Sequence, residues 1–303
     1  MGIPIRSGRV GFAPARGRTI PRRIAFLNEK GGSAKTTLTA NLGAYLALRR
    51  GHRVLAIDMD PQGQLGKVLG AKPHSLRRSA LDLLLDAILD EEPADAASAA
   101  GESETPAPRA GLPVVASRIA NLDLVLANKA LGLAPTFAGD DPDPTGRLER
   151  RFASAPELRR YDFVLLDSPP SFSALTLTVL RAVDEIVIPV PLTFLALDGC
   201  AQLMQTIQTV RTRYGHTGLR ISMVVPTFYR RTRLANEVLE QLKSHFPKEI
   251  AQTVVGFHVK IDEAQSRGLS VFEYAPSNRG AHALAALAEE LEARRPVAEG
   301  EPE

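Results

Sequence analysis

The sequence predicts an α/β fold in which a doubly wound, mostly parallel sheet is flanked by helices. Short segments rich in valine, isoleucine and leucine recur along the chain, and longer stretches of helical character separate them. This alternation indicates parallel strands joined by crossover helices. The chain has 303 residues, 44% of them hydrophobic, and can bury one large core, so we expect a single domain over residues 23–295.

The first strand is predicted at residues 23–28 and the first helix at 38–47, with a glycine-bearing loop between them. The loop has the sequence Lys30-Gly31-Gly32-Ser33-Ala34-Lys35-Thr36-Thr37. Free backbone N–H groups and the positive end of the dipole meet at a helix start, so this context predicts a bound triphosphate. The glycines let the backbone approach phosphate oxygens, Lys35 is expected to bridge the β- and γ-phosphates, and the Thr36 hydroxyl is expected to ligate Mg²⁺. A glycine-rich turn with a chance lysine is the alternative.

One loop position departs from the usual phosphate-binding pattern. Ala34 stands immediately before Lys35, where a Walker A loop ordinarily has glycine. If this position requires a positive φ, alanine introduces strain of about 1 kcal/mol. We expect such strain to slow turnover or to shift the loop without abolishing nucleotide binding.

Two further predicted strands end in carboxylates. The strand at 54–58 ends at Asp58, and Asp60 follows in the turn. The apolar run at 161–166 is closed by Asp167 and two prolines. A carboxylate at the carboxyl end of a buried strand can hold Mg²⁺ beside a triphosphate, and we expect Asp167 to do so. Aspartates that cap the following helix are the alternative at each position.

The remaining predicted elements complete the sheet. Apolar strands are expected at 185–190 and 219–226, with a helix over 197–214 between them. Cys200 is the single cysteine of the sequence, which excludes internal disulfides and cysteine-ligated clusters. We expect it to be buried as a small hydrophobic side chain.

Together these segments resemble the ParA/MinD family of ATPases, whose P-loop is of the deviant Walker A type. The loop matches the family pattern KGGxGK[ST] as KGGSAKT, and the segments at Asp60 and Asp167 resemble DxDPQ and YDxVLLDxPP. The resemblance covers nearly everything from residue 23 to residue 291 and is strongest to ParA (Soj)-type partitioning ATPases. It implies a P-loop NTPase fold with ATP and Mg²⁺ as cofactors.

The resemblance also implies roles for individual residues. Lys30 is implied to reach across a two-fold axis to the nucleotide of the partner subunit, which couples ATP binding to formation of a homodimer. Asp60 is implied to position the attacking water, and Asp58 to support the magnesium site. The implied catalytic residues are Lys30, Lys35 and Asp60, the nucleotide-binding residues are those of 30–37, and the metal-site residues are Thr36, Asp58 and Asp167. For Lys30 taken alone, a solvated loop lysine is the alternative.

Basic residues in the carboxyl half predict a DNA-binding surface. The segment 227–234 resembles TMxDxRTxL, one residue shorter, and places Arg231 at the family's DNA-contacting arginine. The segment 259–268 resembles NVRLSEAPSxGK and places Lys260 at a second basic contact. The residues expected to extend the patch are Arg230, Arg233 and Arg267. Contacts of these cations with phosphates release counterions, which predicts salt-sensitive binding without sequence preference. Solvated helix faces are the alternative.

The ends and two insertions differ from a minimal member of the family. Residues 1–22 carry arginines and no acid, and we expect them to be disordered and to contact DNA or an activating partner, or to be a solvated leader. Residues 90–110 and 139–147 are predicted to be flexible insertions, and 296–303 an acidic tail. The sequence shows no apolar run of 18 residues, no basic amphipathic helix in the tail and no secretory signal. We therefore expect no membrane partner and a cytoplasmic, nucleoid-associated protein.

The sequence thus predicts an ATPase that forms an ATP-sandwich dimer, binds DNA non-specifically and hydrolyses ATP when a ParB-like or other activating partner stimulates it. The expected cargo is a chromosome, a plasmid or another cellular assembly positioned on the nucleoid. One alternative is a metabolic P-loop enzyme that uses ATP to activate a small carboxylate or amine and ignores DNA. Another is a non-hydrolysing nucleotide switch, for which Ala34 provides a reason.

Overall fold

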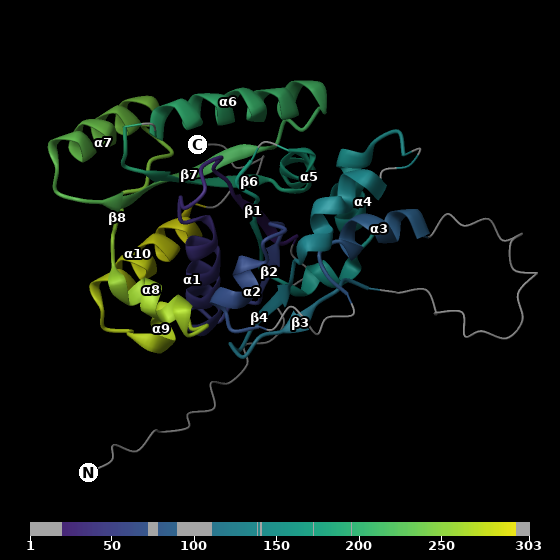
Figure 1. Cartoon of the computed structure of the whole chain (residues 1–303), viewed down its shortest axis with the longest axis horizontal. Helices are drawn as coiled ribbons and strands as arrows, with labels where there is room; N and C mark the ends of the chain where they lie inside the picture. Colours follow the sequence, from purple (N-terminus) through teal and green to yellow (C-terminus); the bar gives the residue numbers. More distant parts are fainter. Residues whose placement is uncertain are drawn as a thin grey trace, which may run out of the picture.

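The computed structural model describes residues 20–71, 78–89, 111–137, 139, 141–171, 173–194 and 196–294. Over these residues an eight-stranded sheet with the order β3-β4-β2-β5-β1-β6-β7-β8 has helices on both faces (Figure 1). Every neighbouring pair of strands is parallel except the pair β3–β4. The predicted doubly wound, mostly parallel α/β fold is confirmed.

The strands predicted from apolar runs are all present, with small differences at their ends. The strands are β1 Arg22–Phe26, β2 Val54–Asp58, β3 Val115–Ala116, β4 Leu122–Val125, β5 Phe163–Asp167, β6 Glu185–Pro191, β7 Arg220–Tyr229 and β8 Val255–Gly256. The sequence did not indicate β3, β4 or β8, because segments of two to four residues carry too little periodicity.

The helices divide between the two faces of the sheet. They are α1 Lys35–Leu48, α2 Gln64–Val68, α3 Asp82–Leu89, α4 Arg147–Ala153, α5 Ala174–Ala182, α6 Ala196–Arg213, α7 Arg233–His245, α8 Val259–Ser266, α9 Val271–Tyr274 and α10 Arg279–Ala293. Figure 1 shows α1, α2 and α8 to α10 on one side of the sheet and α3 to α7 on the other. Within the described ranges, no helix combines the length and the apolar character needed to cross a membrane.

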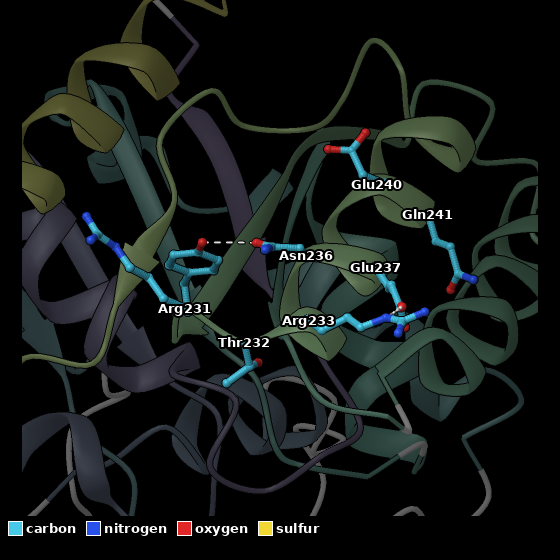
Figure 2. Close-up of a pocket in the computed structure, with 8 residues that line it drawn as sticks. Arg231, Thr232, Arg233, Asn236, Glu237, Glu240 and Gln241 are labelled. Atoms are coloured by element: carbon cyan, nitrogen blue, oxygen red, sulfur yellow. Dashed lines mark hydrogen bonds and ion pairs between the residues drawn. The ribbon is translucent and has the colours of Figure 1, made fainter.

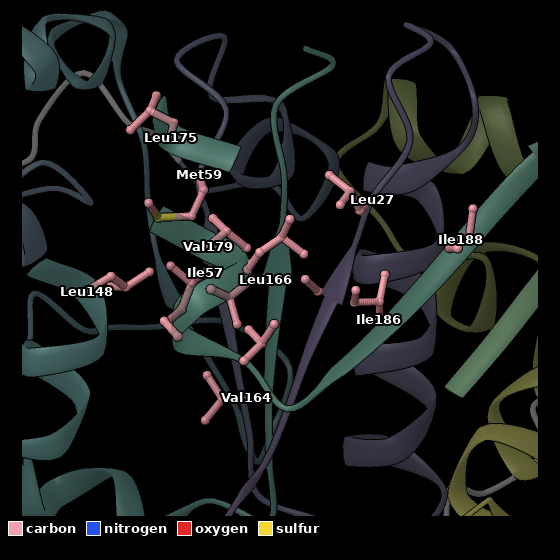
Figure 3. Packing of buried hydrophobic residues seen from close by; sticks show 14 of the residues in the cluster. Leu27, Ile57, Met59, Leu148, Val164, Leu166, Leu175, Val179, Ile186 and Ile188 are labelled. Atoms are coloured by element: carbon pink, nitrogen blue, oxygen red, sulfur yellow. The ribbon is translucent and has the colours of Figure 1, made fainter. Parts of the chain in front are cut away.

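Each face of the sheet has its own hydrophobic core. Along β1, Ile24 and Phe26 pack with α1 and α10, whereas Ala25 belongs to the core on the opposite face. Figure 3 shows part of that opposite core, where Leu166 and Val179 lie among residues from neighbouring strands and helices. Strands buried on both faces explain why the predicted strands are almost continuously apolar.

The predicted extensions and insertions lie mostly outside the described residues. This holds for residues 1–19, for 90–110 and for the tail 296–303. The disordered extension was predicted to reach residue 22, but Arg22 is the first residue of β1 and pairs with Glu185. Residues 141–147 are described and differ from the flexible insertion that we predicted: Pro144–Gly146 forms a 3₁₀ turn that leads into α4. Ion pairs hold this turn, one between Asp141 and Arg147 at 2.7 Å and one between Asp143 and Arg181.

Candidate active site

The carboxyl ends of β1, β2 and β5 lie side by side at one edge of the sheet. Asp167 is the register partner of Phe26 on β1 and of Asp58 on β2. The loop that leaves β1 therefore passes beside both carboxylates before it enters α1 at Lys35. The fold thus brings the predicted phosphate loop and the predicted metal-site carboxylates together.

The backbone of the loop forms an open cradle at the start of α1. Gly32 has φ 69° and Ala34 has φ 78°, so two loop residues take the left-handed conformation. A Cβ atom built at Gly31 or Gly32 would have no atom within 4 Å, which shows open space on this side of the loop. A helix start with open space beside its glycine loop is suited to an anion such as a polyphosphate.

Lys35 points back along the inside of the loop. Its Nζ atom donates a hydrogen bond to the Lys30 carbonyl oxygen at 3.1 Å, and the residue is only 6% exposed. Burial lowers the pKa of Lys35, while the negative charges of Asp167 and Asp60 oppose this shift. The ammonium group is thus held at the loop among carboxylates, where it can compensate the charge of a phosphate.

Thr36 and Asp167 form the part of the site that fits a magnesium ion. The Thr36 hydroxyl donates to Asp167 Oδ2 at 2.6 Å. Asp167 is 1% exposed, and burial raises its pKa to about 7. Its Oδ1 atom and the Ser33 hydroxyl are buried without a hydrogen-bond partner among the described residues. A hydroxyl and a carboxylate with a free buried oxygen are hard donors of the kind that Mg²⁺ prefers, so these residues fit the ion.

Asp58 and Asp60 shape the turn after β2. Asp58 Oδ1 accepts a hydrogen bond from Asp60 N at 3.0 Å, and Asp58 Oδ2 accepts one from Leu65 N at 3.0 Å. Burial and the neighbouring charge of Asp167 raise the pKa of Asp58 well above its ordinary value. Both oxygens of Asp58 are therefore already used in the turn, which favours indirect support of a metal over direct ligation. Asp60 is partly exposed, and its negative charge opposes the effect of burial, which lowers the pKa of Lys35.

Asn28 fixes the start of the loop, a role that sequence reasoning missed. Its Oδ1 atom accepts from Lys30 N at 2.9 Å, and its Nδ2 atom donates to the Pro189 carbonyl oxygen at 2.6 Å. A polar residue directly after an apolar strand was the available signal. Cys200 is buried as predicted, and burial raises its pKa to about 11, with the nearby charge of Lys30 opposing the shift.

Replacing Ala34 with glycine is expected to stabilise the nucleotide-free protein. The left-handed φ of 78° strains an alanine by about 1 kcal/mol. The extra entropy of glycine in the unfolded chain offsets part of this relief, so we expect a net gain of roughly 0.5 kcal/mol. Denaturant titration of the free energy of unfolding measures it. The same substitution at Ala47, inside α1, is the control and is expected to destabilise by about 1 kcal/mol. A loss of stability in Ala34→Gly would show that the loop does not hold this conformation.

The raised pKa of Asp167 predicts a pH dependence of stability. Because its pKa rises from an ordinary 3.8 to about 7 on folding, the folded state holds the proton more tightly. The contribution to stability is fully present below the ordinary pKa and is lost as pH rises through about 7. Between about pH 5 and pH 8 without Mg²⁺ or nucleotide, the wild type is therefore expected to lose roughly 2 kcal/mol more than Asp167→Asn. Parallel pH profiles of the two proteins in chemical denaturation would contradict this.

The predicted DNA-binding arginines lie on the segment between β7 and α7. Arg230 stacks over the exposed ring of Phe257 with its Cζ atom 5.6 Å from the centroid. Arg233 has a side chain that is 94% exposed and pairs with Glu237 at 2.8 Å. Arg231 and Arg233 line an open groove of about 830 Å³ with the start of α7. Figure 2 shows Arg231 pointing away from Arg233, so the structure does not gather these arginines into one cluster.

The other predicted basic residues lie on and after α8. Lys260 Nζ pairs with Glu263 at 2.7 Å, and this partner raises the pKa of Lys260. Both Lys260 and Arg267 lie over the ring of Tyr274, at 5.7 and 5.1 Å from its centroid. The structure therefore brings Lys260 and Arg267 together on one aromatic ring.

Sequence comparison with known proteins identifies the family of this chain. A family model described as an AAA domain matches residues 21–221. The chain is 37% identical over 278 residues to the chromosome-partitioning ATPase Soj of Thermus thermophilus, covering 90% of this chain and 96% of the relative. It is 34% identical over 276 residues to the sporulation initiation inhibitor protein Soj of Bacillus subtilis, covering 89% and 98%.

A solved structure shares the fold of this chain. Cobyrinic acid a,c-diamide synthase from Mycobacterium smegmatis with a bound ATP analogue and magnesium matches with a TM-score of 0.68 and 28% identity, over 89% of this chain and 93% of that chain. The family model, the identity to the Soj proteins and the confirmed fold together assign the chain to one family. The chain belongs to the ParA/Soj family of partitioning ATPases, within the wider MinD/ParA group.

Proposed function

We propose that this ATPase binds ATP and Mg²⁺ at loop 30–37, forms an ATP-dependent homodimer, binds DNA without sequence preference and is released by hydrolysis that a ParB-like or other partner stimulates. The observation that carries the proposal is the buried Oδ1 atom of Asp167, which has no protein partner among the described residues and lies beside Thr36 and Lys35. A cytoplasmic protein working on the nucleoid, with a chromosome, plasmid or other assembly as cargo, follows from this activity.

Each residue of the site has a role in phosphoryl transfer to water. Mg²⁺ when bound supplies positive charge to the β- and γ-phosphates, and Thr36 and Asp167 would hold it. Lys35 compensates negative charge that develops on the phosphates, and the amides of the loop fix their position. Asp60, which is partly exposed beside this charge cluster, accepts a hydrogen bond from the attacking water and orients it. Lys30 acts on the nucleotide of the partner subunit.

The basic residues support the DNA-binding part of the proposal. Arg230, Arg231 and Arg233 are exposed at the start of α7, and Lys260 and Arg267 are exposed around α8. Exposed guanidinium and ammonium groups bind phosphates without reading bases. The ion pairs of Arg233 and Lys260 are exposed and therefore weak, so they open to phosphate at little cost.

A second candidate is an enzyme that uses ATP to activate a small substrate. The structural likeness to the Mycobacterium smegmatis synthase favours it. That candidate requires ATP turnover that depends on a small carboxylate or amine and is indifferent to DNA. The higher identity to the Soj proteins over almost their whole length favours partitioning.

Dimerisation tests the proposal without DNA. Light scattering is expected to give a mass near 32.7 kDa in ADP·Mg²⁺ and about twice that in ATP·Mg²⁺. Lys30→Ala is expected to stay monomeric in both nucleotides, because it lacks the cation proposed to cross the dimer axis. The matched control is Lys243→Ala, an exposed lysine on α7. A wild type that stays monomeric in ATP·Mg²⁺ would contradict the dimer.

A further inference from the structure

Helix α8 makes a direct contact with the helix that begins at the phosphate loop. Gln265 Nε2 on α8 donates a hydrogen bond to Thr37 Oγ1 at 2.8 Å. Thr37 lies in the first turn of α1 and follows Thr36, whose hydroxyl donates to Asp167. Thr36 in the site is therefore linked to α8 through its neighbour Thr37 and one hydrogen bond.

The end of α8 also presses against the segment that follows α2. A Cβ atom built at Gly268 would lie 2.7 Å from the Cα atom of Gly70, and one built at Gly70 would lie 2.8 Å from the Gly268 carbonyl oxygen. The two backbones are thus in contact with no room for a side chain. Helix α2 itself is tied to the metal-site strand, because Asp58 accepts a hydrogen bond from Leu65 N. A shift of the turn after β2 must therefore move α8 or open this contact.

Helix α9 is hydrogen-bonded to α1 and, through Arg118, to the end of α2. Asn41 on α1 is buried, and its Oδ1 atom accepts from Val271 N at 2.9 Å. Arg118 joins α9 to the end of α2, since it donates to the Leu69 carbonyl oxygen at 2.9 Å and to both oxygens of Glu273 at 3.0 Å. Figure 1 shows α8 and α9 beside α1 and α2 on one face of the sheet.

The same unit carries two of the predicted DNA contacts. Lys260 lies on α8, Arg267 follows it directly, and both cations lie over the ring of Tyr274 at the end of α9. The direction in which these cations point therefore depends on how α8 and α9 sit against α1 and α2.

We propose that Gln265 is a positioning residue that transmits the nucleotide state of the loop to the basic groups of α8 and α9. This inference rests on the proposed function. In the ATP state the Gln265–Thr37 bond holds α8 in the arrangement that presents Lys260 and Arg267 to DNA, and in the ADP state the bond is loosened. The family segment NVRLSEAPSxGK has proline where Gln265 stands, and proline has no side-chain donor, so this link is a property of the present chain.

The size of the effect follows from the bond that is removed. A neutral hydrogen bond that is present in one state and absent in the other changes an equilibrium by roughly two- to tenfold. The quantity to measure is the ratio of the dissociation constants for random-sequence duplex DNA in ADP·Mg²⁺ and in ATP·Mg²⁺. Because coupling between two binding sites is reciprocal, DNA must change the ratio of ATP affinity to ADP affinity by the same factor.

Three variants separate positioning from stability. Gln265→Met keeps the length of the side chain but removes its donor, and we expect it to lower the ratio by roughly two- to tenfold without changing ATP affinity in the absence of DNA. Gln265→Glu can accept a hydrogen bond from the Thr37 hydroxyl, so it is expected to restore the ratio even if its charge weakens DNA binding in both nucleotides. Ser266→Ala is the matched control, because its exposed hydroxyl bonds only within α8 in the described structure. A wild-type ratio in Gln265→Met would overturn the inference.

Hydrogen exchange of the α8 amides distinguishes failure of the relay from failure of the proposed function. If the wild type shows no nucleotide-dependent DNA binding, the proposed function fails, and exchange still tests the relay. The relay predicts that amide protection over residues 259–266 differs between ATP·Mg²⁺ and ADP·Mg²⁺ in the wild type and that the difference shrinks in Gln265→Met. Equal protection in both nucleotides in the wild type would overturn the relay whatever happens with DNA.

Discussion

Replacing Lys35 with alanine is expected to abolish ATP binding. The ammonium group is buried at the loop beside Asp167 and Asp60, where water screens charge poorly. Charge-assisted bonds to phosphate are strong in such a place, so their loss is expected to weaken ATP binding roughly 100-fold or more. Calorimetric titration with ATP·Mg²⁺ measures the affinity.

Two further variants show whether the effect of Lys35→Ala comes from loss of the positive charge at this position. Lys35→Met keeps most of the side-chain volume without the charge, so it separates loss of the cation from collapse of the loop. Lys243→Ala removes an exposed lysine on α7 that pairs with Glu240, and is expected to bind ATP like the wild type. Unchanged ATP affinity in Lys35→Ala would contradict the assignment of the phosphate loop.

Replacing Asp60 with alanine is expected to stop hydrolysis while ATP remains bound. Its carboxylate accepts a hydrogen bond from Gln62 N at 2.9 Å. This bond lies in the turn after β2 and not in the phosphate loop, so we expect ATP binding to persist in the variant. Its charge also raises the pKa of Asp167, and removing that charge favours the ionised form that binds Mg²⁺. Loss of the group that orients water is expected to slow turnover by roughly 10²- to 10⁴-fold.

Asp60→Ala is also expected to be trapped in its ATP-bound state. With ATP bound and not hydrolysed, Asp60→Ala is expected to persist as a DNA-bound dimer, which sedimentation with DNA detects. Asp60→Asn keeps the acceptor for Gln62 N and is expected to behave in the same way, which separates the chemical role from the turn. An Asp60→Ala monomer that still releases phosphate at the wild-type rate would contradict the role. Wild-type phosphate release no faster than that of Asp60→Ala would instead support a non-hydrolysing switch.

The parts of the site that were predicted are those encoded by neighbouring residues. The glycine loop, Thr36 and the carboxylate at the end of each strand follow from local patterns, and the parallel sheet brings them to one edge. Ala34 was predicted to be strained if its φ were positive, and its φ of 78° meets that condition. The bond between Gln265 and Thr37 joins residues 228 positions apart, so no local pattern indicates it.

The predicted DNA-binding residues show where sequence patterns reach their limit. Motif similarity grouped Arg231 and Arg233 as neighbours, but the turn into α7 sends their side chains in different directions (Figure 2). Arg233 and Glu237 have the i,i+4 spacing of a helical ion pair, so this pair can be predicted from the sequence once α7 is placed correctly. The contact of Lys260 and Arg267 with Tyr274 depends on the fold of α8 against α9, which spacing alone does not give.

The most direct test of the proposed function is binding of the wild-type protein to random-sequence duplex DNA in ATP·Mg²⁺ and in ADP·Mg²⁺ across a salt series. We predict binding that requires ATP and weakens steeply with salt, because exposed arginines and lysines replace counterions on the phosphates. Equal binding in both nucleotides, or none in either, would contradict a nucleotide-controlled partitioning ATPase, and absence of binding would favour an ATP-dependent enzyme acting on a small substrate.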